Sequence, residues 1–254
     1  MKSTKKSLKP RGRGRYRLEA PNMGELDLDS SISAERQVYA LLRQAIMSGV
    51  FVPGSSLTGR SIAESLGVSP TPVRDALKRL EADGVLQARS KSAYYLITLS
   101  RAEYLEVLAL RMQVEGYAAD CAARVATPAD VARIRNINDR YASTKDLAES
   151  IRLNFQFHFE IYKLAKSKVL LEIVENLWMR IGPSMHLHVR GYDVPEVVKN
   201  HRKIIDALKH KDAAAAKRAL SEDMKEAIRA IAPLLPESPE SGSADMPSLP
   251  FVAL

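Results

Sequence analysis

The 254-residue chain contains only one cysteine, Cys121. A single cysteine excludes a disulfide framework within the chain, and its alanine-rich surroundings predict a small buried side chain rather than a nucleophile. The sequence also lacks an apolar run long enough to span a membrane. No apolar segment follows the basic N-terminus, so the start does not have the pattern of a secretory signal. We therefore expect a cytoplasmic protein with no membrane partner.

Acidic residues are missing from the first 17 positions. The basic residues of this segment are Lys2, Lys5, Lys6, Lys9, Arg11, Arg13, Arg15 and Arg17. The segment is polar and rich in glycine, so we expect residues 1–30 to form a basic, disordered arm. Since the net charge of the whole chain is +8, the rest of the sequence is close to neutral. Two interpretations stay open: a solubilising tail, or an arm that follows nucleic acid phosphates.

Residues 31–99 have the order of a winged helix-turn-helix domain. Apolar spacing predicts a helix between Ser33 and Gly49 and a short one between Thr58 and Gly67. A third predicted helix follows a glycine turn and begins with "SPTP". Pro70 and Pro72 in this segment favour a helix start. The segments "VLQA" and "AYYLITL" then read as two strands joined by the basic loop "RSKS".

The basic residues of the third predicted helix lie outside its apolar stripe. In a winged helix-turn-helix its N-terminal half enters the major groove, where arginine bonds guanine and threonine binds phosphate. A solvated basic face on an ordinary amphipathic helix is the alternative. The order of helix, glycine turn, helix and basic wing favours DNA binding.

From about residue 100 strand patterns almost disappear. We expect an all-helical domain over residues 100–232 and a disordered tail, rich in proline and serine, over 233–254. The predicted helices span residues 101–124, 128–142, 146–166, 168–187, 195–210 and 212–232. The predicted fold is therefore mainly α, with a winged helix-turn-helix followed by a helical bundle.

Several motifs resemble those of one family of regulators. The run "LLRQAIMSGVFVPGSSLTGRSIAESLGVSPTPVRDALKRLEADGVL" closely resembles the DNA-binding domain of GntR-superfamily transcription regulators. The segments "LRMQVEGYAADCAARVAT", "NFQFHFEIYKLAKS" and "NHRKIIDALKHKDAAAAKRAL" look like the effector domain of the FadR-type subgroup, called FCD. The resemblance covers about residues 34–232 and implies a DNA-binding homodimer rather than an enzyme.

The resemblance implies a set of DNA-contacting residues. Positions that match the family's readers, together with polar neighbours on the same helix and wing, are Arg60, Ser69, Thr71, Arg74, Lys78 and Lys91. Two departures stand out. Many relatives carry arginine where this chain has Pro70, and the wing lacks the usual glycine at its tip. An altered operator sequence is the expected consequence.

The resemblance also implies a divalent metal site and an effector site. The matching positions are Asn154, His158 and His201, and Asp223 replaces the family's last histidine. This set suits zinc, manganese or nickel. The competing interpretation is a site that has drifted into polar core residues. Arg111 matches a basic residue that holds an acidic effector, while a salt bridge to Glu115 one turn later is the plainer alternative.

These features predict a regulator that is associated with the bacterial nucleoid and binds a palindromic operator. We expect a small anionic effector, a carboxylate, to change that binding. A regulator with a metal-free or decayed pocket is the main alternative. A metal-dependent hydrolase is the remote one, because no general base stands at a recognisable spacing from the metal set.

Overall fold

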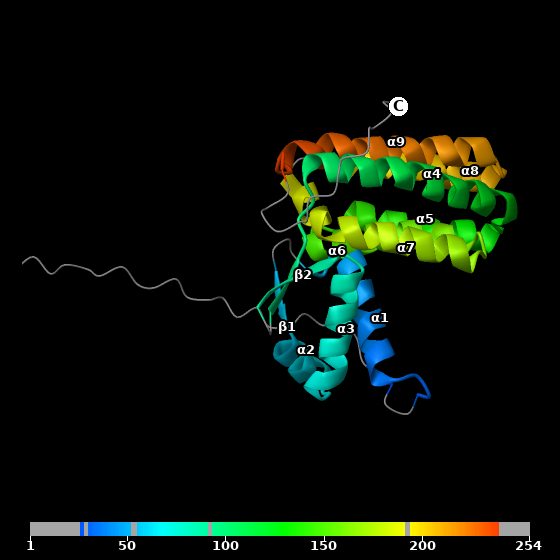
Figure 1. Ribbon diagram of the computed structural model, residues 1–254. Helices are drawn as coiled ribbons and strands as arrows, with labels where there is room; N and C mark the ends of the chain where they lie inside the picture. The colour runs from blue at the N-terminus through cyan, green and yellow to red at the C-terminus, as the bar shows by residue number, and fades with distance from the viewer. Residues whose placement is uncertain (1–25, 28–29, 52–54, 91–92, 191–193, 239–254) are drawn as a thin grey trace, which may run out of the picture.

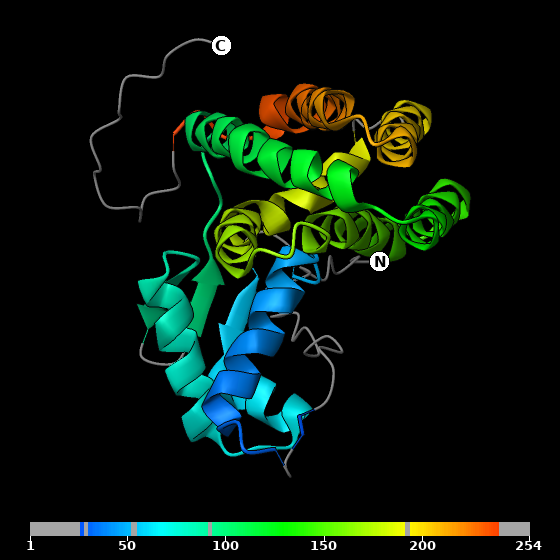
Figure 2. The same cartoon turned by 90° about the vertical axis from the view of Figure 1, so that its right-hand side faces the viewer.

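A computed structural model shows a small winged-helix part beneath a larger helical bundle (Figure 1 and Figure 2). The structure describes residues 26–27, 30–51, 55–90, 93–190 and 194–238. The mainly α fold is confirmed. Most of the predicted basic arm, the wing residue Lys91 and the last 16 residues of the chain lie outside the described residues.

Three helices and three short strands form the winged-helix part. The helices are α1 Ala34–Met47, α2 Gly59–Leu66 and α3 Pro70–Ala82, and the strands are β1 Ser56–Thr58, β2 Leu86–Ser90 and β3 Ala93–Leu96. The predicted caps are present: the Ser33 hydroxyl accepts from the N–H of Arg36, and Thr58 accepts from that of Ser61. Gly67 ends α2 in the left-handed conformation, which is why a glycine stands there.

The sheet has one strand more than the sequence predicted. Its order is β1-β3-β2, with both pairs antiparallel, whereas the sequence predicted only the two strands that correspond to β2 and β3. Three residues are too few to show an alternating pattern. The strand forms because β3 offers a free edge and because the side chain of Leu57 is buried against the core.

Six α-helices build the bundle. They are α4 Arg101–Val125, α5 Pro128–Ser143, α6 Leu147–Lys163, α7 Lys168–Ile181, α8 Val194–His210 and α9 Ala213–Ile231. The single helix predicted over 168–187 is wrong at its end, because α7 stops at Ile181 and a 3-10 helix, η1 Gly182–Arg190, follows. Pro183 has no N–H to continue the α-helical ladder, so the break falls beside it.

The expected tail begins later than predicted. A short 3-10 helix, η2 Ala232–Leu234, follows α9, and Leu235 is buried. The carbonyl of Pro236 accepts a hydrogen bond of 2.8 Å from the N–H of Arg101 at the start of α4. Leu235 and Pro236 therefore contact the bundle, and residues 239–254 of the predicted tail lie outside the described residues.

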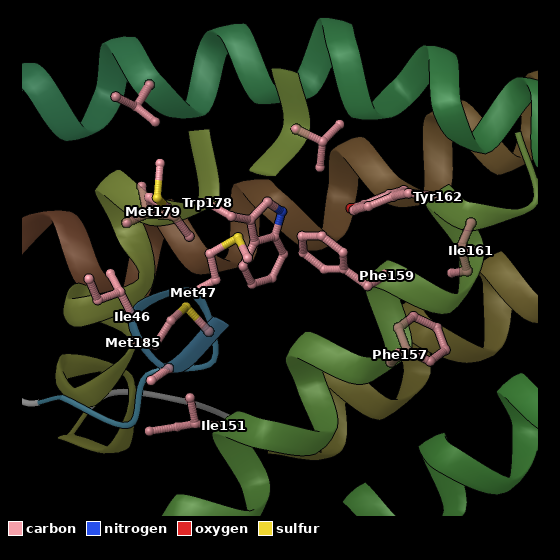
Figure 3. Packing of buried hydrophobic residues seen from close by; sticks show 14 of the residues in the cluster. Ile46, Met47, Ile151, Phe157, Phe159, Ile161, Tyr162, Trp178, Met179 and Met185 are labelled. Carbon is pink, nitrogen blue, oxygen red and sulfur yellow. The ribbon is translucent and has the colours of Figure 1, made fainter. Parts of the chain in front are cut away.

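The two parts share a packed junction at the C-terminal end of α1. Figure 3 shows Ile46 and Met47 beside Ile151 and Met185 of the bundle. A Cβ atom at Gly182 would collide with the carbonyl oxygen of Ile46, and one at Gly49 would lie 2.6 Å from the Ile151 side chain. The junction therefore depends on close backbone approach, which only glycine allows.

Candidate DNA-binding face and metal centre

The face of α3 opposite the core carries the residues implicated in DNA binding. Val73, Ala76, Leu77 and Leu80 are fully buried, whereas Thr71, Arg74 and Lys78 are exposed on the other side. The N-terminal end of α3 lies far from the bundle and beside α2 (Figure 1). The arrangement leaves this end of the helix open to a groove of DNA.

Glycine at the start of α2 makes room for Arg74. A Cβ atom on Gly59 would lie 3.2 Å from the Cγ atom of Arg74, so the arginine stem lies over a bare backbone. On the same helix, Arg60 forms a 2.9 Å ion pair with Glu64 while its side chain stays 82% exposed. An exposed pair of this kind contributes little and can exchange for a phosphate.

Ser69 occupies the N-cap position of α3, as predicted, but its hydroxyl makes no capping hydrogen bond. Pro70 takes the first helical position and needs no N–H there. Ser69, Pro70 and Thr71 are exposed at this helix start, where Pro70 and Pro72 lack N–H groups and Thr71 retains one. Such a start is suited to bind a phosphate oxygen.

Inside the bundle, three helices bring together the predicted metal-ligating residues. Asn154 and His158 come from one face of α6, His201 from α8 and Asp223 from α9, and all four are buried. The Nε2 atom of His158 lies 3.4 Å from Oδ2 of Asp223, and that of His201 lies 3.7 Å from Oδ1. Two ligands bound tetrahedrally to zinc are about 3.4 Å apart, so these spacings suit one shared cation.

The buried acceptor atoms of this cluster fit a cation. Asn154 Oδ1 and His201 Nε2 are buried and have no hydrogen-bond partner among the described residues. His201 Nδ1 lies 3.0 Å from Oδ1 of Asn138, which fixes the proton on Nδ1 and leaves the lone pair of Nε2 for a ligand bond. Burial lowers the pKa of His201 to about 3, with Asp223 opposing that shift, so its imidazole is neutral.

Arg111 lies deep in the bundle beside this cluster. Its Nε and Nη2 donate to the two carboxylate oxygens of Glu115 at 2.5 and 3.0 Å. The phenol of Tyr162 donates to the same carboxylate and lies 3.3 Å from Nδ1 of His158. Burial, followed by the charge of Glu115, raises the pKa of Tyr162, which keeps the phenol protonated.

The side chain of Trp178 on α7 closes one side of this buried region. The Cζ atom of Arg111 lies 4.3 Å from its ring centroid, and the ring centroid of His158 lies 5.7 Å away. Phe155 and Phe159 pack edge-on against it. Figure 3 shows Trp178 and Phe159 in this part of the core, and Tyr162 beyond Phe159 as seen from Trp178.

Two family descriptions match the chain. The model of bacterial regulatory proteins of the gntR family matches residues 34–96, and the FCD domain matches residues 106–226. The chain belongs to the GntR family and carries an FCD domain. The matched families and relatives are transcription regulators rather than enzymes.

This GntR-family regulator matches most of the length of several relatives. The HTH-type transcriptional regulator McbR of Escherichia coli is 29% identical over 203 residues, which cover 78% of this chain and 92% of the relative. The solved structure titled E. coli McbR/YncC superposes with a TM-score of 0.74 at 28% identity, covering 80% of this chain and 99% of that one. The Exu regulon transcriptional regulator of E. coli is 27% identical over 210 residues, which cover 75% of this chain and 81% of the relative.

Sequence reasoning missed several residues of the regulator's buried cluster. Asn138, Tyr162 and Trp178 were not singled out, although Tyr162 follows His158 by one helical turn and Trp178 is the chain's single tryptophan. His186 does not join the buried cluster, because its Nε2 atom lies 2.5 Å from the carbonyl oxygen of Gly49 at the junction. No helix in the described part of the chain is long and apolar enough to cross a membrane.

Proposed function

We propose that the chain is a sequence-specific DNA-binding regulator whose affinity for its operator changes when a small anion binds in the helical bundle. The observation that carries the DNA-binding part is the exposed polar and basic face of α3, which projects at the end of the molecule away from the bundle. Thr71, Arg74 and Lys78 lie on this face at spacings of three and four residues, which place them on one side of a helix.

Each DNA-binding residue has a role that follows from its chemistry. Arg74 reads a base edge, because its guanidinium can donate two parallel hydrogen bonds to guanine. Ser69, Thr71, Arg60 and Lys78 bind phosphates and set the register of the helix in the groove. Lys91, outside the described residues, completes the set on the wing.

A gel mobility assay with DNA from upstream of its own gene tests this assignment. Arg74→Ala is expected to weaken binding by about 1–3 kcal/mol, or roughly tenfold to a hundredfold. Lys209→Ala is the matched control, because it removes one exposed basic side chain from α8, far from α3. Equal binding by Arg74→Ala and wild type would contradict the role given to α3.

An exposed apolar row on α4 supports a homodimer. Leu110 and Tyr117, two turns apart on one face, are 52% and 59% exposed, and Val169 and Ile173 are exposed on the neighbouring α7. A second copy would cover these side chains and present two α3 helices to successive major grooves of a palindromic operator. Light scattering should give twice the chain mass for the wild type and one chain mass for Leu110→Glu with Tyr117→Glu.

The buried acceptors fit a divalent cation, so we infer that Asn154, His158, His201 and Asp223 would hold zinc, manganese or nickel. Their chemistry supports this inference because the set offers one amide oxygen, two imidazole nitrogens and one carboxylate. A bound cation attracts an anionic group to the pocket. Within the chain, Asn138 orients His201, and the nitrogen of Arg111 that Glu115 leaves open, Nη1, can bind the same anion.

The route from pocket to DNA passes through α6 and the junction. Asn154 and His158 lie on the helix that begins near Ile151, and Ile151 packs against Gly49 just beyond α1. A shift of α6 when the pocket fills would therefore move α1, which packs against α3. An effector changes DNA affinity in this way only if it binds more tightly to the protein with α6 shifted than to the protein with α6 unshifted, or the reverse.

Melting temperatures and gel shifts in the presence of zinc and small carboxylic acids test the effector part. An acid that binds the folded protein raises its melting temperature and changes the amount of DNA shifted. The alternative of a metal-free or decayed pocket requires the opposite result, with no metal in the purified protein and no response to any acid. The unpartnered buried acceptors favour the metal-binding alternative.

A further inference from the structure

Two buried side-chain donors in the bundle, Asn138 Nδ2 and the indole N–H of Trp178, have no hydrogen-bond partner among the described residues, and a cation cannot pair with either. The indole nitrogen of Trp178 is buried and has no hydrogen-bond partner among the described residues, and the whole residue is only 1% exposed. Indole N–H is a donor only. A metal ion satisfies the acceptors Asn154 Oδ1 and His201 Nε2, but it repels the hydrogen of an N–H group.

The position of this donor relates it to the metal-ligating cluster. The indole ring lies 5.7 Å from the imidazole of His158, centroid to centroid, and the guanidinium carbon of Arg111 lies 4.3 Å above it. Figure 3 draws the indole nitrogen in blue, on the side of the ring that faces Tyr162 in that view. The phenol of Tyr162 in turn lies 3.3 Å from His158 Nδ1.

We propose that Trp178 is an effector-contacting residue whose indole N–H donates to an oxygen of a bound monocarboxylate. This inference rests on the proposed function, because it places the ligand beside the cation held by His158 and its partners. The free-energy cost of burying a hydrogen-bond donor is offset when that donor meets an acceptor. The acid supplies that acceptor with one oxygen, while the other faces the cation.

The charges of the buried cluster favour a single negative charge on the ligand. Arg111 is neutralised by Glu115 through two hydrogen bonds, and both side chains are buried. Asp223 adds one negative charge, and histidines bind a metal ion as neutral imidazoles. With a divalent cation and neutral histidines the cluster carries one net positive charge, which one monocarboxylate cancels; a dicarboxylate would leave an excess negative charge in a buried site.

The single tryptophan makes the test direct. A spectrum that correlates ¹H with ¹⁵N in the full-length, zinc-loaded protein contains one indole resonance, from Trp178. The probes are acetate, lactate and pyruvate, with malonate and succinate for comparison. We expect the monocarboxylates to raise the melting temperature more than the dicarboxylates and to move the indole resonance downfield.

A second measurement removes the donor and keeps the ring. Replacement of tryptophan by β-(benzothiophen-3-yl)alanine puts sulfur in place of the N–H, and the single tryptophan confines the change to one position. Acid affinity should fall roughly tenfold. Zinc stoichiometry should stay unchanged, since the ligands of the cation are intact, and this checks that the protein is folded.

The outcomes separate this inference from the proposed function. If an acid raises the melting temperature and changes DNA binding while the indole resonance does not move, the acid binds without Trp178 and the inference is wrong. If no acid has any effect on melting or DNA binding, the effector part of the proposed function fails as well. Tighter binding of the dicarboxylates would overturn the assignment of ligand charge.

Discussion

Glu115 holds Arg111 by two parallel hydrogen bonds inside the bundle, with Nε donating to Oε1 at 2.5 Å and Nη2 to Oε2 at 3.0 Å. The exposed fractions of the two side chains are 6% and 0%, so solvent does not screen the pair. The salt bridge considered from the sequence is therefore present. Its burial makes it far more consequential than an exposed pair one helical turn apart.

Removal of one partner should destabilise the bundle. Glu115→Gln leaves the guanidinium of Arg111 buried without a counter-charge, and we expect a loss of about 3–5 kcal/mol in the free energy of unfolding. Urea unfolding followed by circular dichroism measures the loss. The double variant Arg111→Met with Glu115→Gln should recover part of it. The single variant Arg111→Met completes the comparison. If the double variant loses as much free energy of unfolding as the two single variants lose in total, the two side chains do not interact.

Metal content should depend on the histidines of the cluster. Mass spectrometry of the purified protein should find one divalent metal per chain, and His158→Ala should lose it, because Nε2 of His158 faces Asp223 at 3.4 Å. His210→Ala is the control, since His210 is exposed on α8 and contacts only a local backbone carbonyl. Equal metal in His158→Ala and wild type would place the metal elsewhere.

The junction between the two parts should not tolerate a side chain at position 182. Gly182→Ala puts a methyl group into the carbonyl oxygen of Ile46, so we expect a lower melting temperature and an altered response of DNA binding to effector. Gly116→Ala tests whether any added methyl group has this effect. Its Cβ would meet only the flexible side chain of Lys217, and alanine favours the helix. A melting temperature for Gly182→Ala equal to that of Gly116→Ala would contradict the close packing of the junction.

The junction should also weaken in mild acid. Burial lowers the pKa of His186 below its ordinary value of 6.5, although its hydrogen bond to Gly49 opposes the shift. The unfolded chain therefore takes up a proton first, and stability present above pH 6.5 is lost as the pH falls toward the folded-state pKa. We expect the melting temperature of the wild type to fall more between pH 7.5 and 5.5 than that of His186→Gln. Parallel curves for the two proteins would rule out this contribution.

The sequence by itself determined the elements whose signals are local. Ser33 and Thr58 begin helices because their hydroxyls accept from nearby N–H groups, and Gly67 ends one because the turn needs a positive φ. The buried stripe of α3 was readable from apolar spacing. Asn154 and His158 could be placed on one face since they are four residues apart on a single helix.

Tertiary structure decided what depends on contacts between distant segments. No local pattern places Asp223 of α9 opposite His158 of α6, or Asn138 of α5 beside His201 of α8. The strand β1 forms only because β3 is next to it. The unpartnered donor of Trp178 also depends on tertiary structure, because the packing of α6 against α7 buries the indole nitrogen. Local signals follow from backbone chemistry, whereas a buried site is set by which side chains the packing brings within a few ångströms of each other.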